Sequence, residues 1–343
     1  MLKQRLLMAA SHAGTPPGGT TLYSMGSNGS GVTAQNTTSG NSLVPTVAVD
    51  SHNTWTKVVI APTSSSAGNG TGIGLLSNGT LWTWGSNFRG GAGSGSAGQG
   101  SNSNNYLVPT QVGSVTTWTD IAGARYGGLA VRSNGTLWSW GTDNQGELGQ
   151  GGSFNVVVVP TQVGSGTTWS KVFSGFWTTF LIDTSGKLYA LGTNDSYATG
   201  LGTQTGNTLT PTQVGSATNW VSVSTTPYGA IGIQSNGTAW SWGTDLSGEL
   251  CQGSSGGTYT TPTQIGTGTH WIYAATDSYG GSFSFLIQNV SGSKTLWTAG
   301  NNTNYQTGLG TNSGNTTTLT QVGSATNWVS VVCLNEASQD VFP

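Results

Sequence analysis

Charge is scarce in this chain, and its scarcity excludes several classes of partner. Charged residues make up 6% of the 343 residues, whereas an ordinary globular domain has about a quarter. Nine Lys and Arg oppose eleven Asp and Glu, which leaves a net charge of -2. Proteins that bind nucleic acid need a basic excess to neutralise phosphates. We therefore expect no nucleic-acid partner.

Cysteines and long apolar runs are equally scarce. Two Cys in the whole chain exclude a disulfide framework and a zinc site built from cysteines, and the sequence leaves open whether Cys251 and Cys333 meet. No apolar run approaches the ~20 residues of a membrane span. The apolar run 6–10 has five residues, fewer than the ~7–15 of a secretory signal. We expect neither a membrane span nor secretion by this route.

Three short elements recur six times along the chain. The first is a pentapeptide with an aromatic second residue and a final Gly, found at Leu22–Gly26, Leu81–Gly85, Leu137–Gly141, Leu188–Gly192, Ala239–Gly243 and Leu296–Gly300. An element resembling Pro-Thr-Gln-Val-Gly, as at 109–113, follows each pentapeptide, and a lone Trp such as Trp118 comes next. The spacing of these elements predicts a structural unit of about 51 residues.

Within one unit the pattern indicates β-structure. The segment Ser133–Thr136 places Asn-Gly between two apolar runs, which predicts a hairpin with a type I′ turn. The flanking runs 128–132 and 136–140 predict two strands, and 118–121 and 161–163 predict two more. Four short strands in about 50 residues are typical of one propeller blade. The fold class expected is therefore all-β.

The segment Leu137–Gly151 resembles the repeat of the regulator of chromosome condensation family, and Ala239–Gly253 resembles it with Cys251 in a Gly position. The resemblance implies a β-propeller, usually seven-bladed, that serves as a protein-binding platform. Members of the family include a nucleotide exchange factor, a β-lactamase inhibitor and a light sensor. The positions that match a usual His of the family hold Gly127, Thr178, Gly229 and Gly280. This difference argues against the transfer of exchange activity.

The repeat count predicts a six-bladed β-propeller of ~51-residue repeats over residues 19–343. Because the chain starts and ends within a repeat, we expect N- and C-terminal strands to share one blade and so to close the propeller. The expected C-terminal strands are 329–332 and 341–342, and the expected N-terminal strands are 20–25 and 45–49.

Residues 1–18 exceed what this closure needs, and they are predicted to form an N-terminal arm. Its apolar residues are expected to contact another subunit of an assembly. These candidate assembly residues are Leu2, Leu6, Leu7 and Met8.

Aromatic residues form two series. Pairs such as Trp138 and Trp140 lie on one face of a strand and are expected to pack between blades. A second series lies eight residues after the lone Trp of four repeats, in the turn between the first two strands. Because aromatic side chains are frequent interface anchors, these residues are the candidate binding residues, with packing of the turn as the alternative: Tyr126, Trp177, Tyr228 and Tyr279.

Catalytic and metal-binding patterns are not recognisable. Asp143–Glu147 and Asp245–Glu249 lack the second acid of a calcium loop. His12, His52 and His270 share no metal-ligand spacing. We therefore predict a protein that is not an enzyme and uses no cofactor and no metal.

A rigid propeller without a visible active site predicts a structural or binding protein. Low charge, abundant Gly, Ser, Thr and Asn, and the arm favour a virion component, such as a phage tail, fibre or capsid-associated protein that mediates assembly or host attachment. Its expected partners are other virion subunits and a host receptor or glycan. One alternative is a bacterial surface or secreted adhesin or lectin. A second alternative is an intracellular exchange or regulatory factor.

Overall fold

The computed structural model describes residues 7–10, 22–27, 33–38, 41–48, 52, 54–61, 70–89, 92–93, 95–101, 105–152, 155–204, 206–277, 282–312, 314–331 and 333. Strands dominate these residues, together with one short 3-10 helix, η1 (Asp195–Tyr197). No helix among them is long and apolar enough to span a membrane. The described residues fall into two units, unit 1 up to Val172 and unit 2 from Phe173 onward, and each is described separately.

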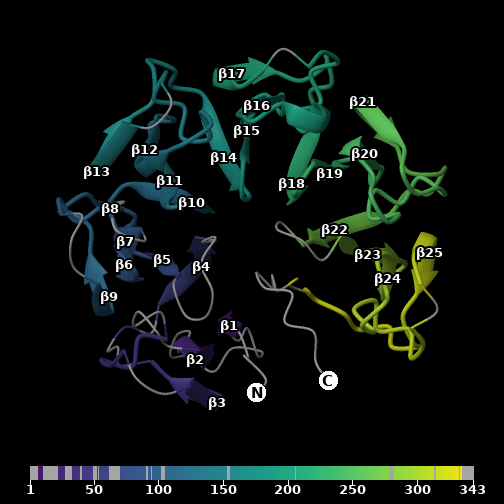
Figure 1. Cartoon of the computed structure of the whole chain (residues 1–343), viewed down its shortest axis with the longest axis horizontal. Helices are drawn as coiled ribbons and strands as arrows, with labels where there is room; N and C mark the ends of the chain where they lie inside the picture. Colours follow the sequence, from purple (N-terminus) through teal and green to yellow (C-terminus); the bar gives the residue numbers. More distant parts are fainter. Residues whose placement is uncertain are drawn as a thin grey trace. The chain divides into compact units, whose positions relative to one another are not determined.

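Unit 1 contains one three-stranded sheet, two four-stranded sheets and a small hairpin (Figure 1). The three-stranded sheet consists of β1 (Leu7–Ala10), β2 (Leu22–Ser27) and β3 (Asn41–Val47). The next consists of β4 (Trp55–Ala61), β5 (Thr71–Leu76), β6 (Leu81–Gly85) and β9 (Tyr106–Gln111). The hairpin pairs β7 (Phe88–Arg89) with β8 (Ala92–Gly93). The last sheet consists of β10 (Trp118–Ala124), β11 (Gly127–Arg132), β12 (Leu137–Asp143) and β13 (Asn155–Gln162).

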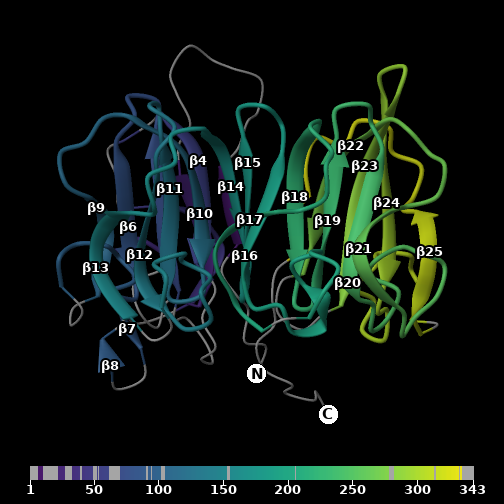
Figure 2. The ribbon, with the colours of Figure 1, turned by 90° about the horizontal axis from the view of Figure 1, so that it is seen from above.

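Unit 2 holds three further four-stranded sheets (Figure 2). The division between the units falls within the first strand, β14. The first sheet consists of β14 (Trp169–Ser174), β15 (Thr178–Asp183), β16 (Leu188–Gly192) and β17 (Thr208–Gln213). The second consists of β18 (Trp220–Thr226), β19 (Gly229–Gln234), β20 (Ala239–Thr244) and β21 (Thr258–Gln264). The third consists of β22 (Trp271–Thr276), β23 (Phe283–Val290), β24 (Ser293–Gly300) and β25 (Thr316–Gln321). The prediction of an all-β chain with four strands per repeat is confirmed for five sheets.

The Ser-Asn-Gly-Thr segments form the predicted hairpins, but the predicted turn type is wrong. Between β11 and β12, Gly135 has a φ of +77° while Asn134 does not have positive φ. The Asn134 side chain instead accepts hydrogen bonds from the N–H and the hydroxyl of Thr136 at 3.2 and 2.7 Å, and Trp138 Nε1 donates to the Thr136 hydroxyl at 2.8 Å. Only one residue with positive φ is needed, as in a three-residue hairpin loop.

Each of these turns also receives a bond from the next repeat. The Gly135 carbonyl accepts from Trp169 N–H at 3.0 Å, and a Cβ at Gly135 would lie 2.1 Å from the Thr167 carbonyl oxygen. The same bond joins Trp118 to Gly79, Trp220 to Gly186 and Trp271 to Gly237. In these four repeats the lone Trp is therefore fixed at the main chain by the hairpin turn that precedes it.

The second Trp of the pentapeptide fills the core, as expected from its position. Trp140 and Trp242 are fully buried, and their Nε1 groups donate to the carbonyls of Ser96 at 3.0 Å and Ala198 at 3.1 Å. A Cβ on Gly200 would lie 2.8 Å from the Trp242 ring. Sheets within a unit are thus held together by an indole that is packed on a glycine loop of the preceding sheet.

In the β22–β25 sheet, other residues fill the space that the buried Trp occupies in other sheets. Its pentapeptide has Ala299 in the Trp position, and the preceding loop has Cys251 in the Gly position. Both side chains are buried in one cluster. The Ser284 hydroxyl donates to the Glu249 carbonyl at 2.6 Å, which replaces the bond that the indole makes in other sheets.

The N-terminal residues differ from the prediction. Strand β2 pairs with β1 on one edge and with β3 on the other, so a C-terminal strand cannot pair with Leu22 and Tyr23, and that expectation is wrong. Leu7 and Met8 of the predicted arm lie in β1, whereas Leu2 and Leu6 lie outside the described residues. The arm is predicted from the surplus of residues 1–18 over the closure, and the short run 7–10 carries no turn or alternation signal that would have identified it as a strand.

Near the C-terminus, Trp328 repeats the pattern of the earlier lone Trp residues. Its N–H donates to the Lys294 carbonyl at 3.2 Å, next to the β23–β24 turn. The Tyr273 hydroxyl of β22 donates to the Val331 carbonyl at 2.9 Å. The described residues 329–331 of the expected strand 329–332 form no strand, and the expected strand 341–342 lies outside the described residues.

Candidate functional site

One end of each four-stranded sheet, here called the loop end, brings together the turn between its first two strands and the loop between its last two. Main-chain bonds join the two connections: Thr193 N–H donates to the Trp177 carbonyl, and Thr244 N–H to the Tyr228 carbonyl, both at 3.0 Å. Thr142 N–H donates likewise to the Tyr126 carbonyl at 3.1 Å. The described members of the predicted aromatic series, Tyr126, Trp177 and Tyr228, therefore lie at the loop end.

The members of this series differ in exposure. In unit 1, Tyr126 is 6% exposed and has a φ of +60°, and the Arg125 guanidinium lies 4.8 Å from its ring centroid. In unit 2, Trp177 is half-buried against Phe176, with ring centroids 4.7 Å apart. Tyr228 is 41% exposed. Tyr126 is thus mainly a packing residue, whereas Tyr228 is available to a partner.

Tyr279 lies outside the described residues, and Ser282 takes the structural position that was expected for Tyr279. The Ser282 carbonyl accepts from Asn301 N–H at 2.8 Å, as the Tyr228 carbonyl does in its sheet. Phe283 pairs with Gly300 as Gly127 pairs with Gly141. The first connection of this sheet is longer, so counting eight residues from Trp271 identifies the wrong position.

Two exposed residues of the loop end were missed in the sequence. Leu246 is 48% exposed and Tyr305 is 58% exposed, and each lies in the loop between the last two strands of its sheet in unit 2. A signal existed for Leu246, because the related loop has the polar Asn144 in the same position. An apolar residue in an otherwise polar, exposed loop position is a candidate contact residue.

The loops of unit 2 are held by bonds between sheets. The Thr244 hydroxyl donates to the Ser196 carbonyl of η1 at 3.2 Å, and Gly253 N–H donates to the Thr317 carbonyl of β25 at 3.1 Å. Loops fixed in this way can present side chains with a smaller ordering cost on binding.

Two carboxyl pairs lie beneath the loop end. All four side chains, Asp143, Glu147, Asp245 and Glu249, are fully buried. Burial raises the pKa of Glu147 to about 8 and the pKa of Glu249 to about 7, and it raises the pKa values of both Asp residues. Each pair accepts backbone N–H bonds of its own loop, so these acids organise the loop rather than face a substrate.

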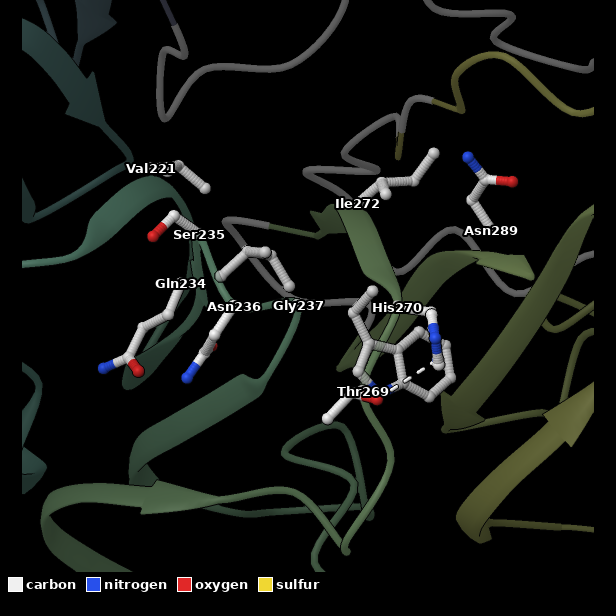
Figure 3. A pocket seen from close by; sticks show the side chains of 11 residues that line it. Val221, Gln234, Ser235, Asn236, Gly237, Thr269, His270, Ile272 and Asn289 are labelled. Atoms are coloured by element: carbon white, nitrogen blue, oxygen red, sulfur yellow. Dashed lines mark hydrogen bonds between the residues drawn. The ribbon is translucent and has the colours of Figure 1, made fainter. Parts of the chain in front are cut away.

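At the opposite end of the sheets in unit 2, a groove of about 550 Å³ lies between β19 and β22 (Figure 3). Val221 and Ser235 lie on one side, and Ile272 and Asn289 lie on the other. His270 is the titratable residue among the described lining residues, and its Nδ1 lies 3.1 Å from the Thr269 hydroxyl. The groove lacks a paired acid and base. Among the described residues, no group of three or more His, Cys, Asp or Glu could hold a metal ion.

The repeated four-stranded sheets define a repeat protein of the β-propeller class. The family model of the regulator of chromosome condensation (RCC1) repeat matches residues 134–182. Protein RCC2 homolog of Danio rerio is 29% identical over 121 residues, which cover 34% of this chain and 23% of that protein. The chain therefore matches only about a quarter of this relative's length. The resemblance to the RCC1-like repeat family is confirmed.

Solved structures share the fold at low sequence identity. Prp20p of Saccharomyces cerevisiae has a TM-score of 0.74 at 16% identity, over 94% of this chain and 75% of that chain. Yeast RCC1 (Prp20) in a structure with Kap60 has a TM-score of 0.74 at 18% identity, over 94% and 73%. Human WBSCR16 has a TM-score of 0.75 at 15% identity, over 96% and 81%. These likenesses establish an RCC1-like propeller fold.

These comparisons overturn the main functional prediction. Prp20p is described with its binding to Gsp1p and histones, and yeast RCC1 binds Kap60. These similar proteins are RCC1- and RCC2-type proteins of eukaryotes rather than parts of a phage tail, fibre or capsid. The predictions of a virion component, of virion subunits and a host receptor or glycan as partners, and of a location in the virion or outside the cell are therefore wrong.

Proposed function

We propose that this chain is a non-catalytic protein-binding platform that acts inside the cell, the regulatory alternative raised by the sequence. The observation that carries the proposal is the loop end of unit 2, where Tyr228, Leu246 and Tyr305 are exposed on loops held by main-chain bonds. The fold supports it, because Prp20p binds Gsp1p and histones.

The chemistry of these residues suits a protein partner. Tyrosine supplies a large contact area with a polar tip at low entropic cost, and such residues dominate the binding energy of many interfaces. The surface is a set of separate exposed side chains on rigid loops rather than a deep pocket. A folded protein that covers the loop end could contact several of them together.

Binding is a better proposal than nucleotide exchange. The positions that match the usual His of the repeat that this chain resembles hold Gly127, Thr178, Gly229 and Gly280, so none of them carries an imidazole. Catalysis is disfavoured as well, because the carboxyl pairs are fully buried and no reacting group could reach them. The proposed activity is therefore recognition of a partner.

The proposed architecture has six blades, with one blade built from both ends of the chain. Strands β1, β2 and β3 would supply three of its strands, and the segment that starts at Trp328 would supply the first. The bond from Trp328 to Lys294 supports this arrangement, because every other lone Trp that makes it begins a first strand. This closure has three N-terminal strands and one C-terminal strand, instead of two from each end.

The binding proposal is tested with purified core histones and purified Gsp1p as separate probes. The variant Tyr228→Ala/Leu246→Ala is compared with Ile272→Ala, which removes a side chain of similar exposure (44%) from the other end of the same unit. We expect the double variant to weaken binding of one probe by about 30-fold, the equivalent of ~2 kcal/mol, and the control to bind as the wild type does. Equal binding by all three proteins, or no binding of either probe, contradicts the proposal.

A further inference from the structure

The Asp245–Gln252 loop contains a buried carboxyl pair with an unusual distribution of hydrogen bonds. Asp245 Oδ1 accepts from Gly248 N–H at 2.7 Å and from Leu250 N–H at 3.5 Å. Glu249 accepts from Leu246 N–H at 3.1 Å and from Ser247 N–H at 2.6 Å. Asp245 Oδ2 is buried, and no donor faces it. Three of the four carboxyl oxygens therefore accept from the main chain, and the fourth, Asp245 Oδ2, is buried without a donor.

The chain contains the same loop in a form without charge. In the β22–β25 sheet, Asn302 Oδ1 accepts from Thr307 N–H at 3.3 Å, and Gln306 Oε1 accepts from Asn304 N–H at 2.7 Å. These bonds match those of the Asp and Glu in the acid loop. Two neutral amides are thus sufficient to build the loop, and ionisation is not needed for its hydrogen bonds.

Two ionised carboxylates cannot lie together in a buried site without a large cost, because each loses its hydration and repels the other. A proton on one of them removes the repulsion and gives the pair an O–H donor, for which the unpartnered Asp245 Oδ2 provides a place. The titratable groups that face Glu249 are Asp245 and the buried thiol of Cys251. The pKa of Cys251 is raised well above its usual value by burial and by the two acids, so the thiol stays protonated and supplies no cation.

We infer that Asp245 and Glu249 share one proton and form a pH-sensitive latch, which holds Leu246 in place at acid pH and releases it as the proton is lost toward neutral pH. Leu246 is both held by Glu249 through its N–H and exposed at the loop end. The effect of the latch on a partner rests on the proposed function, whereas its effect on the loop does not. The Asp143–Glu147 pair in unit 1 has the same sequence pattern and buried acids.

The direction of the response follows from the raised pKa of Glu249, which burial brings from 4.5 to about 7. A group with a raised pKa in the folded loop stabilises it fully below its ordinary pKa, and this stabilisation is lost as the pH rises through the folded value. The acid loop should therefore weaken between about pH 4.5 and 7 and change little above that range. The Asn302 loop should not respond.

Hydrogen exchange on the free protein tests the latch without any partner. Exchange of peptides that cover 245–252 and 302–308 is followed between pH 5 and 8 and corrected for intrinsic rates. The opening constant of the acid loop should rise by up to about tenfold per pH unit until the proton is lost, while the amide loop stays constant. The same pH response in both loops overturns the inference, and this comparison needs no variant.

A variant sharpens the test. Asp245→Asn/Glu249→Gln copies the Asn302–Gln306 loop, and it should abolish the pH response of 245–252 while that of 143–150 remains. A retained response at 245–252 overturns the latch. Histone or Gsp1p binding by the wild type and by this variant at pH 5.5 and 8 then separates the two proposals. A loop response without any probe binding leaves the latch standing and rejects the proposed function, whereas binding without a loop response does the reverse.

Discussion

The β18–β21 and β22–β25 sheets are joined to the loop before them in two different ways. In the first, the buried Trp242 packs on Gly200 and donates to the Ala198 carbonyl. In the second, Ala299 and Cys251 are buried in one cluster, and the Ser284 hydroxyl donates to the Glu249 carbonyl. In both sheets the space between sheet and loop is filled, and one hydrogen bond reaches a loop carbonyl. The residues that fill the space and make the bond differ, and they change together: Trp with Gly in one sheet, Ala, Cys and Ser in the other.

Removal of the Trp242 ring, which joins the β18–β21 sheet to the preceding loop, should have the largest effect on stability. Trp242→Ala leaves a cavity and an unsatisfied Ala198 carbonyl, so we expect a loss of about 3–5 kcal/mol in the free energy of unfolding. Denaturant unfolding monitored by circular dichroism measures it. Trp240→Ala, at a half-buried position in the same strand, is the control and should cost clearly less. Equal losses would show that the Gly200 contact is not what makes Trp242 important.

Adding a side chain at Gly200, on which the Trp242 ring packs, should have the next largest effect on stability. A Cβ on Gly200 would lie 2.8 Å from the Trp242 ring, and the residue has a φ of +71°. Gly200→Cys should therefore cost about 2–3 kcal/mol. The double variant Gly200→Cys/Trp242→Ala should lose less than the sum of the two single losses, because the clash disappears with the ring. Additive losses in this cycle contradict the proposed exchange of residues as a set.

The two carboxyl pairs should make the stability of the whole protein depend on pH, through the loops that contain them. Because Glu147 and Glu249 have raised pKa values of about 8 and 7, stability should fall as the pH rises from 4.5 through these values. We expect a loss of at least about 2 kcal/mol between pH 5 and 8, measured by unfolding at each pH. Glu147→Gln/Glu249→Gln should flatten the profile. A wild-type profile that rises over this range would reverse the assigned cause.

The smallest effect is expected at the hairpin turns. Asn134→Ala removes the acceptor for Thr136, whose hydroxyl in turn accepts from Trp138 Nε1. Because Asn134 is exposed and water can replace it, a loss of about 1 kcal/mol is expected. Gly135→Ala in the same turn is the contrasting variant and should cost more, since φ is +77° and Thr167 leaves no room for a Cβ. Comparison of the two thermal midpoints decides this ranking.

Much of the fold was predictable because the repeat is encoded by local signals. The pentapeptide, the Asn-Gly turn and the lone Trp correctly indicated four strands per repeat and the RCC1-like class. Strand β1 was missed because Leu7–Ala10 has neither a turn signal nor alternation, and its role depends on pairing with β2. The turn type was missed because the side chain of Asn134, rather than its backbone, is what the turn uses.

The candidate site was less predictable, because exposure depends on neighbours that a repeat pattern does not contain. Tyr126 and Tyr228 occupy the same position in their repeats, yet one is 6% and the other 41% exposed. Tyr279 has the right spacing, but the longer connection after Trp271 gives its place to Ser282. Leu246 was visible as an apolar residue in a polar loop and was not recognised.

The bond from a lone Trp to the preceding hairpin limits where such a chain can be cut or lengthened. Trp118 and Trp271 depend on the carbonyls of Gly79 and Gly237, which lie 39 and 34 positions upstream in the sequence. A duplicated segment that starts at the Trp lacks the turn carbonyl that its first strand binds. A segment that starts before the Asn-Gly turn contains this carbonyl. We therefore expect a whole repeat to be inserted or lost without damage only when the hairpin turn and the following Trp stay on the same segment. The segment that can be duplicated or deleted is thus not one sheet, because each four-stranded sheet starts at the Trp and ends before the next Trp.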